Sequence, residues 1–319
     1  MKFFTTVLAF LTFCSIAYAG ERQPIATFDW AVSETLSMLD IGPLGVTQLE
    51  TYNEWANNGL ITYDAIDLGF GSMPNLELMS HLNPSLIIGG LTRPNEKLSH
   101  IAPTENISLF PITGDPWQAV QDFTLALAER LGRQEHAKRL ILEYEQQLSR
   151  LSHKLSEEQA PLLIIQFRDD RHVWIYGGNS LLQGVLDQLG LTNAWNQPTN
   201  HVGVSVVSID ELPAIEGRLV VLKSPHYTDS IGDRLNRGGL WQALLRLRSS
   251  NTIYLPVNYW TLGGLPSAMR FAETLVETLD LVNEAPHLHT SNAFPAHDSG
   301  MDLSLSDLAG LAFHLLTEA

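Results

Sequence analysis

Basic and aromatic side chains follow the predicted strands of the C-terminal half of the chain, where they could bind an anionic ligand. Arg168 comes directly after the predicted strand 162–167, and Lys223 ends the predicted strand 219–223. Because strand ends in an open α/β sheet face a ligand crevice, we expect these groups to converge there. Two or more cations in one cleft favour an anion through charge-assisted hydrogen bonds. The candidates are Arg168, Arg171, Lys223, His226 and Tyr227.

The local motifs of the common enzyme classes are absent from the sequence. It contains no G-x-S-x-G, H-E-x-x-H, C-x-x-C or Walker A motif, the usual signatures of acyl transfer, zinc hydrolysis, thiol redox chemistry and nucleotide binding. Gly69-Phe70-Gly71 begins like a dinucleotide loop, but Pro74 occupies the third glycine position and has no amide hydrogen. We therefore predict a protein that is not an enzyme, although catalytic residues distant in sequence stay an open alternative.

The first 19 residues have the pattern of a secretory signal peptide. Lys2 precedes the apolar run 3–16, and Ala17-Tyr18-Ala19 forms a small-x-small cleavage site. The run is shorter than the roughly 20 apolar residues of a membrane span, and the bulky Phe13 disfavours lipidation at Cys14, the only cysteine. We therefore expect cleavage after Ala19 and a periplasmic location.

The composition of the chain limits the classes of partner that it can bind. The chain has 319 residues, with 19 Lys and Arg against 35 Asp and Glu, so its formal net charge is −16. Such a surface repels phosphate backbones, and no basic run offers counterion release, which excludes nucleic acid. At 45% hydrophobic residues the chain can fill the cores of two domains.

Hydrophobic patterning predicts an α/β lobe in the N-terminal part of the chain. Short β-branched runs bounded by Gly, Pro, Asn or Asp alternate with helical stretches, for which Ser33 and Asn75 are the expected N-caps. Continuous apolar strands are typical of a sheet covered on both faces. The expected strands are 25–29, 45–48, 65–68, 86–89 and 108–111.

A long helix is expected to join this lobe to a second one. Asp115-Pro116 opens a helical stretch whose first segment ends at Gly132. Residues 133–155 contain no Gly or Pro and repeat leucines at helical spacing, which predicts about 23 residues of helix, roughly 35 Å. A second α/β series follows, with strands at 162–167, 172–176, 219–223 and 253–257 and helices near 180–189, 210–214, 240–247 and 267–281.

The predicted organisation has five parts. They are the signal peptide 1–19, an N-terminal α/β lobe 20–132, an interdomain helix 133–157, a C-terminal α/β lobe 158–284, and a tail 285–319 with a candidate terminal helix. Three histidines of the tail lie within 287–297, but they have no i, i+4 pairing and no acidic cluster beside them. We interpret it as a solvated linker and predict no metal site and no cofactor.

A series of short patches, in one order over about residues 24–282, carries a family resemblance. The chain resembles the periplasmic iron(III)-siderophore substrate-binding proteins of ABC importers, and is nearest to the hydroxamate, ferrichrome-type branch. The patches are 27–36 (TFDWxxxExL), 45–46 (GV), 67–69 (DxG), 74–78 (PNLEL), 83–88 (NPSLII), 101–103 (IAP), 176–181 (YGGNSL), 193–195 (NAW), 207–210 (VSID) and 240–243 (LWQA).

The resemblance implies a fold, a ligand and part of the site. Class III periplasmic binding proteins have two α/β lobes bridged by one long α-helix, and the ferric siderophore lies in a shallow cleft between the lobes, stacked on aromatic side chains. Trp260 aligns with a cleft tryptophan. The family's ligand-binding arginine falls where this chain has Gly71, and the aromatic expected after strand 86–89 is replaced by a segment containing Arg93.

These departures favour an anionic ferric complex, such as a citrate-hydroxamate or catecholate chelate, with Arg93 in place of the missing arginine. The siderophore fills the iron coordination shell, so the resemblance implies no protein ligand to the metal. It also implies docking of a monomer to an ABC permease dimer through one acidic residue on each lobe. Glu77 matches the N-terminal position and Asp210 the C-terminal one, with Glu211 as an alternative.

Two classes of function remain open at this point. The first is a periplasmic binding protein that delivers a ferric siderophore, with ferric catecholate or cobalamin as other ligands. The second is a secreted small-molecule hydrolase. Binding predicts saturable one-to-one association with the ligand recovered intact, whereas hydrolysis predicts an altered product.

Overall fold

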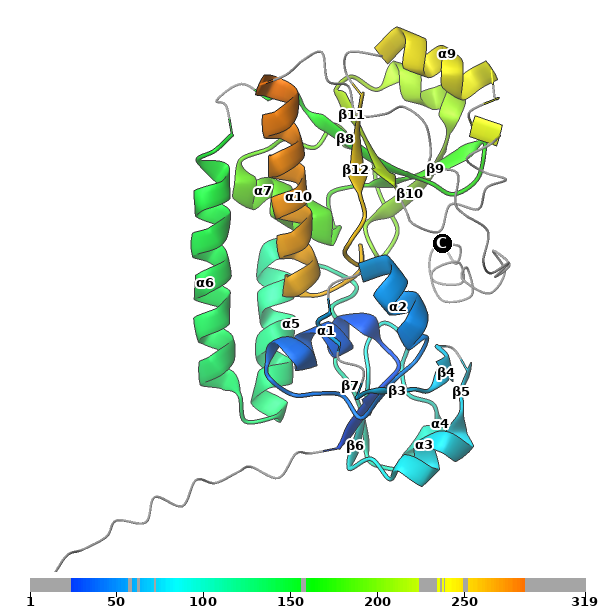
Figure 1. The fold of residues 1–319 in the computed structure, drawn as a ribbon, viewed down its shortest axis with the longest axis vertical. Helices are drawn as coiled ribbons and strands as arrows, with labels where there is room; N and C mark the ends of the chain where they lie inside the picture. Colours follow the sequence, from blue (N-terminus) through cyan, green and yellow to red (C-terminus); the bar gives the residue numbers. More distant parts are fainter. Residues whose placement is uncertain are drawn as a thin grey trace, which may run out of the picture.

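The structure is a computed structural model, and it describes residues 24–56, 59–61, 64–71, 73–155, 159–223, 234–235, 237, 239–248 and 252–284. Two five-stranded sheets form the centres of two lobes, with helices beside them (Figure 1). The signal peptide, the tail, His226 and Tyr227 lie outside the described residues.

The sheet of the N-terminal lobe is entirely parallel and has the order β3-β2-β1-β6-β7. The central strand β1 pairs Ile25 with Leu86 of β6 and Ala26 with Gly45 of β2. A separate antiparallel ribbon joins β4 to β5. The strands are β1 (Ile25–Thr27), β2 (Gly45–Val46), β3 (Ile66–Asp67), β4 (Gly69–Phe70), β5 (Met73–Pro74), β6 (Leu86–Gly89) and β7 (Thr104–Asn106).

The sheet of the C-terminal lobe is mixed and has the order β10-β9-β8-β11-β12. β11 pairs in parallel with β8 and β12, whereas β9 pairs antiparallel with both β8 and β10. The strands are β8 (Leu162–Phe167), β9 (His172–Tyr176), β10 (Val204–Ser208), β11 (Arg218–Lys223) and β12 (Thr252–Pro256), and the 3₁₀-helix η1 (Ile209–Ala214) follows β10.

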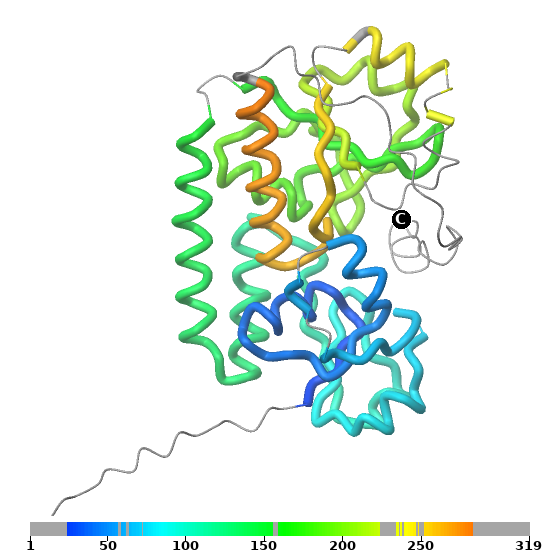
Figure 2. The backbone as a smooth tube through the Cα atoms, in the orientation of Figure 1, coloured from blue at the N-terminus to red at the C-terminus, as the bar shows by residue number. Residues whose placement is uncertain are grey.

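The helices place one hydrophobic core across both lobes. A single cluster of buried side chains includes Leu36 of α1, Val120 of α5, Ile141 of α6 and Phe271 of α10, together with residues of both sheets. The tubes of α6 and α10 run side by side along the molecule (Figure 2). The helices are α1 (Trp30–Met38), α2 (Leu49–Ala56), α3 (Leu76–Leu82), α4 (Glu96–Ser99), α5 (Pro116–Arg130), α6 (Gln134–Ser152), α7 (Leu181–Leu189), α9 (Gly239–Arg248) and α10 (Leu265–Glu284).

Three local predictions were wrong. The first helix begins at Trp30 because Asp29, not Ser33, is its N-cap and accepts a hydrogen bond from the Val32 amide at 3.0 Å. Residues 108–111 form no strand, since the Ser108 hydroxyl bonds the Phe110 amide and carbonyl locally, and the fifth strand is β7. The helix predicted to reach residue 155 ends at Ser152, where the Leu155 amide turns back to the Ser152 carbonyl at 3.1 Å.

Candidate ligand-binding site

A small hollow of about 20 Å³ lies where the carboxyl ends of β1 and β6 meet the loop after β12. The N-terminal lobe contributes the segment after β1 and the segment after β6, and the C-terminal lobe contributes the loop that precedes α10. Both lobes therefore line the same cavity, as expected at the strand ends of α/β sheets. The lining includes Asp29, Trp30, Leu91, Thr92, Trp260 and Leu262.

Aromatic rings from both lobes meet at this site, where Trp30 and Trp260 line the hollow. Trp260, partly buried, packs edge-on against Trp30, with ring centroids 4.7 Å apart, and against Trp55 of α2, at 5.5 Å. Trp30 is held by a hydrogen bond from its Nε1 to the Thr47 carbonyl at 2.9 Å, and it packs edge-on against Tyr52 at 5.5 Å. The edge-on geometry is favourable for aromatic pairs and leaves ring faces for other contacts.

The sequence analysis placed Trp260 at the cleft but did not select Trp30, which lines the hollow, or Trp55, which packs against Trp260. Trp30 directly follows the Asp29 cap at the end of β1, so the strand-end rule applied to the C-terminal lobe could have found it. Trp55 lies on α2, a helix that was not predicted, although the buried residues Leu49, Tyr52 and Ala56 have helical spacing.

Asp29 lines the hollow, but its carboxylate is already used by the fold. Its Oδ1 accepts from the Val32 amide, and its Oδ2 accepts from the Leu91 amide at 2.8 Å. Burial raises the pKa of Asp29, while these backbone hydrogen bonds oppose the rise. A Cβ at Gly90 would collide with this carboxyl group, so glycine is required beside it. Asp29 therefore ties β1 to β6 beneath the site.

The predicted cationic residues lie near strand ends, and those that the structure describes do not line the hollow itself. Arg93 is exposed in the loop between β6 and α4, next to Thr92, which does line it. Arg168 follows β8, and Lys223 ends the neighbouring strand β11. The Lys223 ammonium lies 4.7 Å from the centroid of the Tyr254 ring, and partial burial lowers its pKa.

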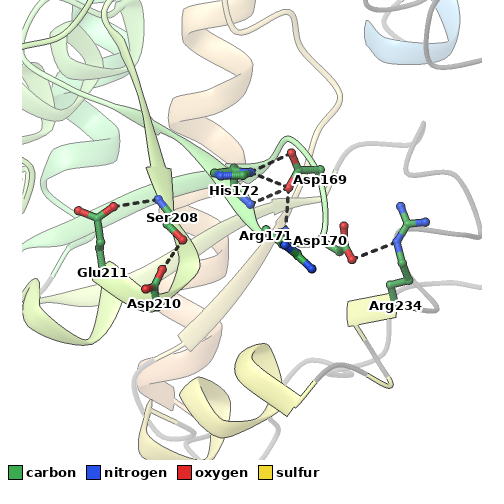
Figure 3. A network of polar contacts seen from close by, with 8 residues as sticks. All are labelled: Asp169, Asp170, Arg171, His172, Ser208, Asp210, Glu211 and Arg234. Carbon is green, nitrogen blue, oxygen red and sulfur yellow. Dashed lines mark hydrogen bonds and ion pairs between the residues drawn. The ribbon is translucent and has the colours of Figure 1, made fainter.

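The turn between β8 and β9 carries carboxylates as well as cations (Figure 3). Asp169 accepts from the Arg171 amide at 2.7 Å and lies 3.0 Å from the His172 ring nitrogen Nδ1. Asp170 pairs with Arg234, with Nε 3.3 Å from Oδ2. These acids offset positive charge in the cluster predicted from sequence.

A buried carboxylate that sequence analysis did not select lies at the contact between the lobes. Glu34 of α1 has no exposed surface and accepts hydrogen bonds from Tyr52, from Ser267 and from the Gly264 amide. Burial raises the pKa of Glu34 to about 7, although these hydrogen bonds and Arg270 favour the charged form.

The two predicted docking acids are exposed and lie on different lobes. Glu77 is in the first turn of α3, which Asn75 caps by accepting from the Leu78 amide at 2.9 Å. Asp210 is in η1 and accepts from the Ser208 hydroxyl, and the alternative Glu211 accepts from the Ser208 amide at 3.2 Å (Figure 3). Glu211 therefore also takes part in the capping box of η1, whereas Asp210 binds the hydroxyl of the N-cap residue Ser208.

Two features are absent from the part of the chain that the structure describes. Among those residues, no three His, Cys, Asp or Glu side chains gather as a metal site. None of the helices described there has the length and apolar character needed to cross a membrane.

Two curated relatives cover most of the chain. The iron(3+)-hydroxamate-binding protein FhuD of Escherichia coli K12 is 32% identical over 264 residues, which are 81% of this chain and 88% of that protein. The Fe(3+)-citrate-binding protein YfmC of Bacillus subtilis is 21% identical over 246 residues, 76% of each chain. The relatives are thus named as binding proteins.

Solved structures share the fold. FhuD from Vibrio cholerae, with Fe3+-Desferal bound, has a TM-score of 0.74 at 24% identity and covers 82% of this chain and 99% of its own. FeuA of Bacillus subtilis, complexed with ferri-bacillibactin, has a TM-score of 0.64 at 20% identity and covers 81% and 93%. Residues 25–256 match the family described as periplasmic binding protein. The chain, with its two sheets and the cavity between them, therefore belongs to the periplasmic binding protein family.

Proposed function

We propose that this protein captures a ferric hydroxamate or mixed citrate-hydroxamate siderophore between its lobes and delivers it to an ABC permease for iron uptake. The observation that carries the proposal is the pair of aromatic rings that line the hollow, Trp30 and Trp260, which come from different lobes and pack edge-on. The identity to a hydroxamate-binding relative supports the ligand class.

The chemistry of such a ligand suits this site. A ferric siderophore supplies the oxygen donors of its own metal ion, so the protein needs apolar faces and a few polar groups rather than metal ligands. Trp260 provides the ring against which the chelate stacks. Arg93, Arg168 and Lys223 supply positive charge at the rim. Tyr227, which lies outside the described residues, is a further candidate for contact with the ligand.

Delivery requires a second surface. In the proposal, Glu77 and Asp210 contact basic residues on the two permease subunits, and their placement on separate lobes sets the orientation of docking. The working form is a monomer in the periplasm, exported by the signal peptide 1–19.

The proposal is tested by titrating tryptophan fluorescence of the protein with ferrichrome, ferrioxamine B, ferric aerobactin, a ferric catecholate and cobalamin. We expect saturable one-to-one quenching by a ferric hydroxamate, no quenching by its iron-free form, and recovery of the ligand intact. Trp260→Phe should remove much of the quenching, whereas the matched change Trp174→Phe, in β9 and away from the hollow, should not.

Other outcomes of the titration would indicate a different ligand or a different function. Saturation by the catecholate or by cobalamin alone would replace the ligand class. An altered product after incubation would favour the hydrolase. Absence of any saturable response would refute siderophore binding.

A further inference from the structure

The loop that carries Trp260 is fastened to the opposite lobe by a buried carboxylate. Glu34 lies in α1, next to the sheet of the N-terminal lobe, whereas two of its three hydrogen-bond donors belong to the C-terminal lobe. The Ser267 hydroxyl donates to Oε1 at 2.7 Å, and the Gly264 amide donates to Oε2 at 3.1 Å. The third donor is the Tyr52 hydroxyl of α2, at 3.0 Å from Oε1.

Ser267 connects this carboxylate directly to the tryptophan. Its hydroxyl oxygen accepts a hydrogen bond from the Trp260 amide at 2.9 Å and donates its own proton to Glu34. The loop is closed by a second bond, from the Gly263 amide to the Trp260 carbonyl at 2.9 Å. Trp260 is therefore two hydrogen bonds away from a side chain of the other lobe, and we name this arrangement the Glu34–Ser267 bridge.

Close packing leaves the bridge little freedom. A Cβ at Gly263 would lie 2.5 Å from the Ser267 hydroxyl oxygen and 2.6 Å from Oε2 of Glu34. Glu34, Ser267 and the Tyr52 ring are all buried, at 0%, 1% and 0% exposure. Their hydrogen bonds are thus shielded from competing water.

We infer that Glu34 is a positioning residue for ligand binding: from the N-terminal lobe, through Ser267, it fixes the backbone of Trp260 at the hollow. This inference rests on the proposed siderophore-binding function. A buried carboxylate is costly compared with an apolar residue of similar size, so a specific geometric role accounts for its presence better than stability does.

The charge state of the bridge changes near neutral pH. The charged and titratable groups that face Glu34 are Tyr52 from α2, Arg270 from α10 and Tyr144 from α6. The charged carboxylate accepts all three hydrogen bonds, whereas the protonated one must donate from one oxygen and so competes with the Ser267 and Tyr52 protons. A glutamine at position 34 imitates the protonated form at every pH.

The test uses the full chain labelled with 5-fluorotryptophan, in which the Trp260 fluorine resonance is assigned by its loss in Trp260→Phe. Glu34→Gln removes the charge, and Ser267→Ala removes the hydroxyl that joins the carboxylate to the Trp260 amide. Tyr52→Phe is the matched control, because it removes a hydroxyl bonded to the same carboxylate oxygen without touching the Trp260 loop.

In the ligand-free wild type the Trp260 resonance should titrate around pH 7, and in Glu34→Gln it should stay constant with pH. Ser267→Ala should shift the resonance, and Tyr52→Phe should leave it in place. With ferrichrome or ferrioxamine B, Ser267→Ala and Glu34→Gln should weaken binding by about tenfold at a pH above neutrality, the size expected for a lost hydrogen bond to a charged group, and Tyr52→Phe by much less.

The inference is overturned if Ser267→Ala changes neither the resonance nor the affinity, or if Tyr52→Phe changes them as much. Should Glu34→Gln not fold, Ser267→Ala decides the matter alone. Failure of the wild type to bind any ferric siderophore would instead overturn the proposed function, while the resonance of the ligand-free protein would still report on the bridge.

Discussion

Replacing Glu34 by glutamine should change how the stability of the protein depends on pH. The carboxyl group has a pKa of about 7 in the folded protein, against an ordinary value of 4.5. The folded state therefore holds a proton that the unfolded state has released over this pH range. In consequence the free energy of unfolding falls as pH rises from the ordinary pKa to the folded one.

The magnitude follows from the size of the shift. Each pKa unit corresponds to about 1.4 kcal/mol, so the full contribution of Glu34 is about 3 kcal/mol. It is present below about pH 4.5, is lost as pH rises through about 7, and is constant above that. Because glutamine does not titrate, Glu34→Gln lacks this contribution to the pH dependence of the unfolding free energy.

The assay is urea unfolding followed by far-UV circular dichroism at several pH values between about 4.5 and 8. The quantity compared is the difference in unfolding free energy between wild type and Glu34→Gln, because other carboxylates contribute equally to both. The control is Glu135→Gln: Lys138 pairs with exposed Glu135 and lowers its pKa below the ordinary 4.5, so the corresponding difference should stay nearly flat across this pH range. If the difference in unfolding free energy between wild type and Glu34→Gln is flat or rises with pH, the reasoning is refuted.

Three further predictions concern the cleft, the docking surface and the bridge. Arg93→Ala should weaken binding of ferric aerobactin by about tenfold and of neutral ferrichrome little, as measured by fluorescence titration, and equal affinities would remove Arg93 from the site. Glu77→Arg should abolish siderophore-dependent growth while leaving siderophore binding intact, and full growth would exclude Glu77 from docking. The control is Glu96→Arg, a change of an exposed residue on α4. Gly263→Ala should destabilise the protein by about 1–3 kcal/mol through its clash with Ser267, whereas Gly178→Ala, with open space around it, should not; equal unfolding midpoints would contradict the packing argument.

The parts of the fold that sequence predicted are those with strong local patterns. β6 and β8 are short, apolar and bounded by polar or turn residues, and both were placed at their observed bounds. α6 was predicted from unbroken helical spacing, but its end was misplaced because a final turn of 3₁₀ type looks the same in sequence.

The site was predicted less completely, for a physical reason. Trp260 was selected because it aligns with a cleft tryptophan of the resembled family and follows a predicted strand. Glu34 falls within the 27–36 patch of the family resemblance, but its principal partner, Ser267, is 233 residues away, and no local periodicity marks it as buried. The burial of Glu34 and its raised pKa arise only when α1 packs against the loop before α10. Hydrophobic periodicity does not predict such a contact between distant segments.

The core shared by both lobes bears on the kinetics of ligand capture. Because α1, α5, α6 and α10 contribute to one buried cluster, closing the lobes like a hinge would break packing that spans the molecule. The relative position of the lobes is therefore set before the ligand arrives, so binding carries little cost from ordering one lobe against the other. Association rates should then be similar for siderophores of one charge, and discrimination among them should reside in how long each remains bound.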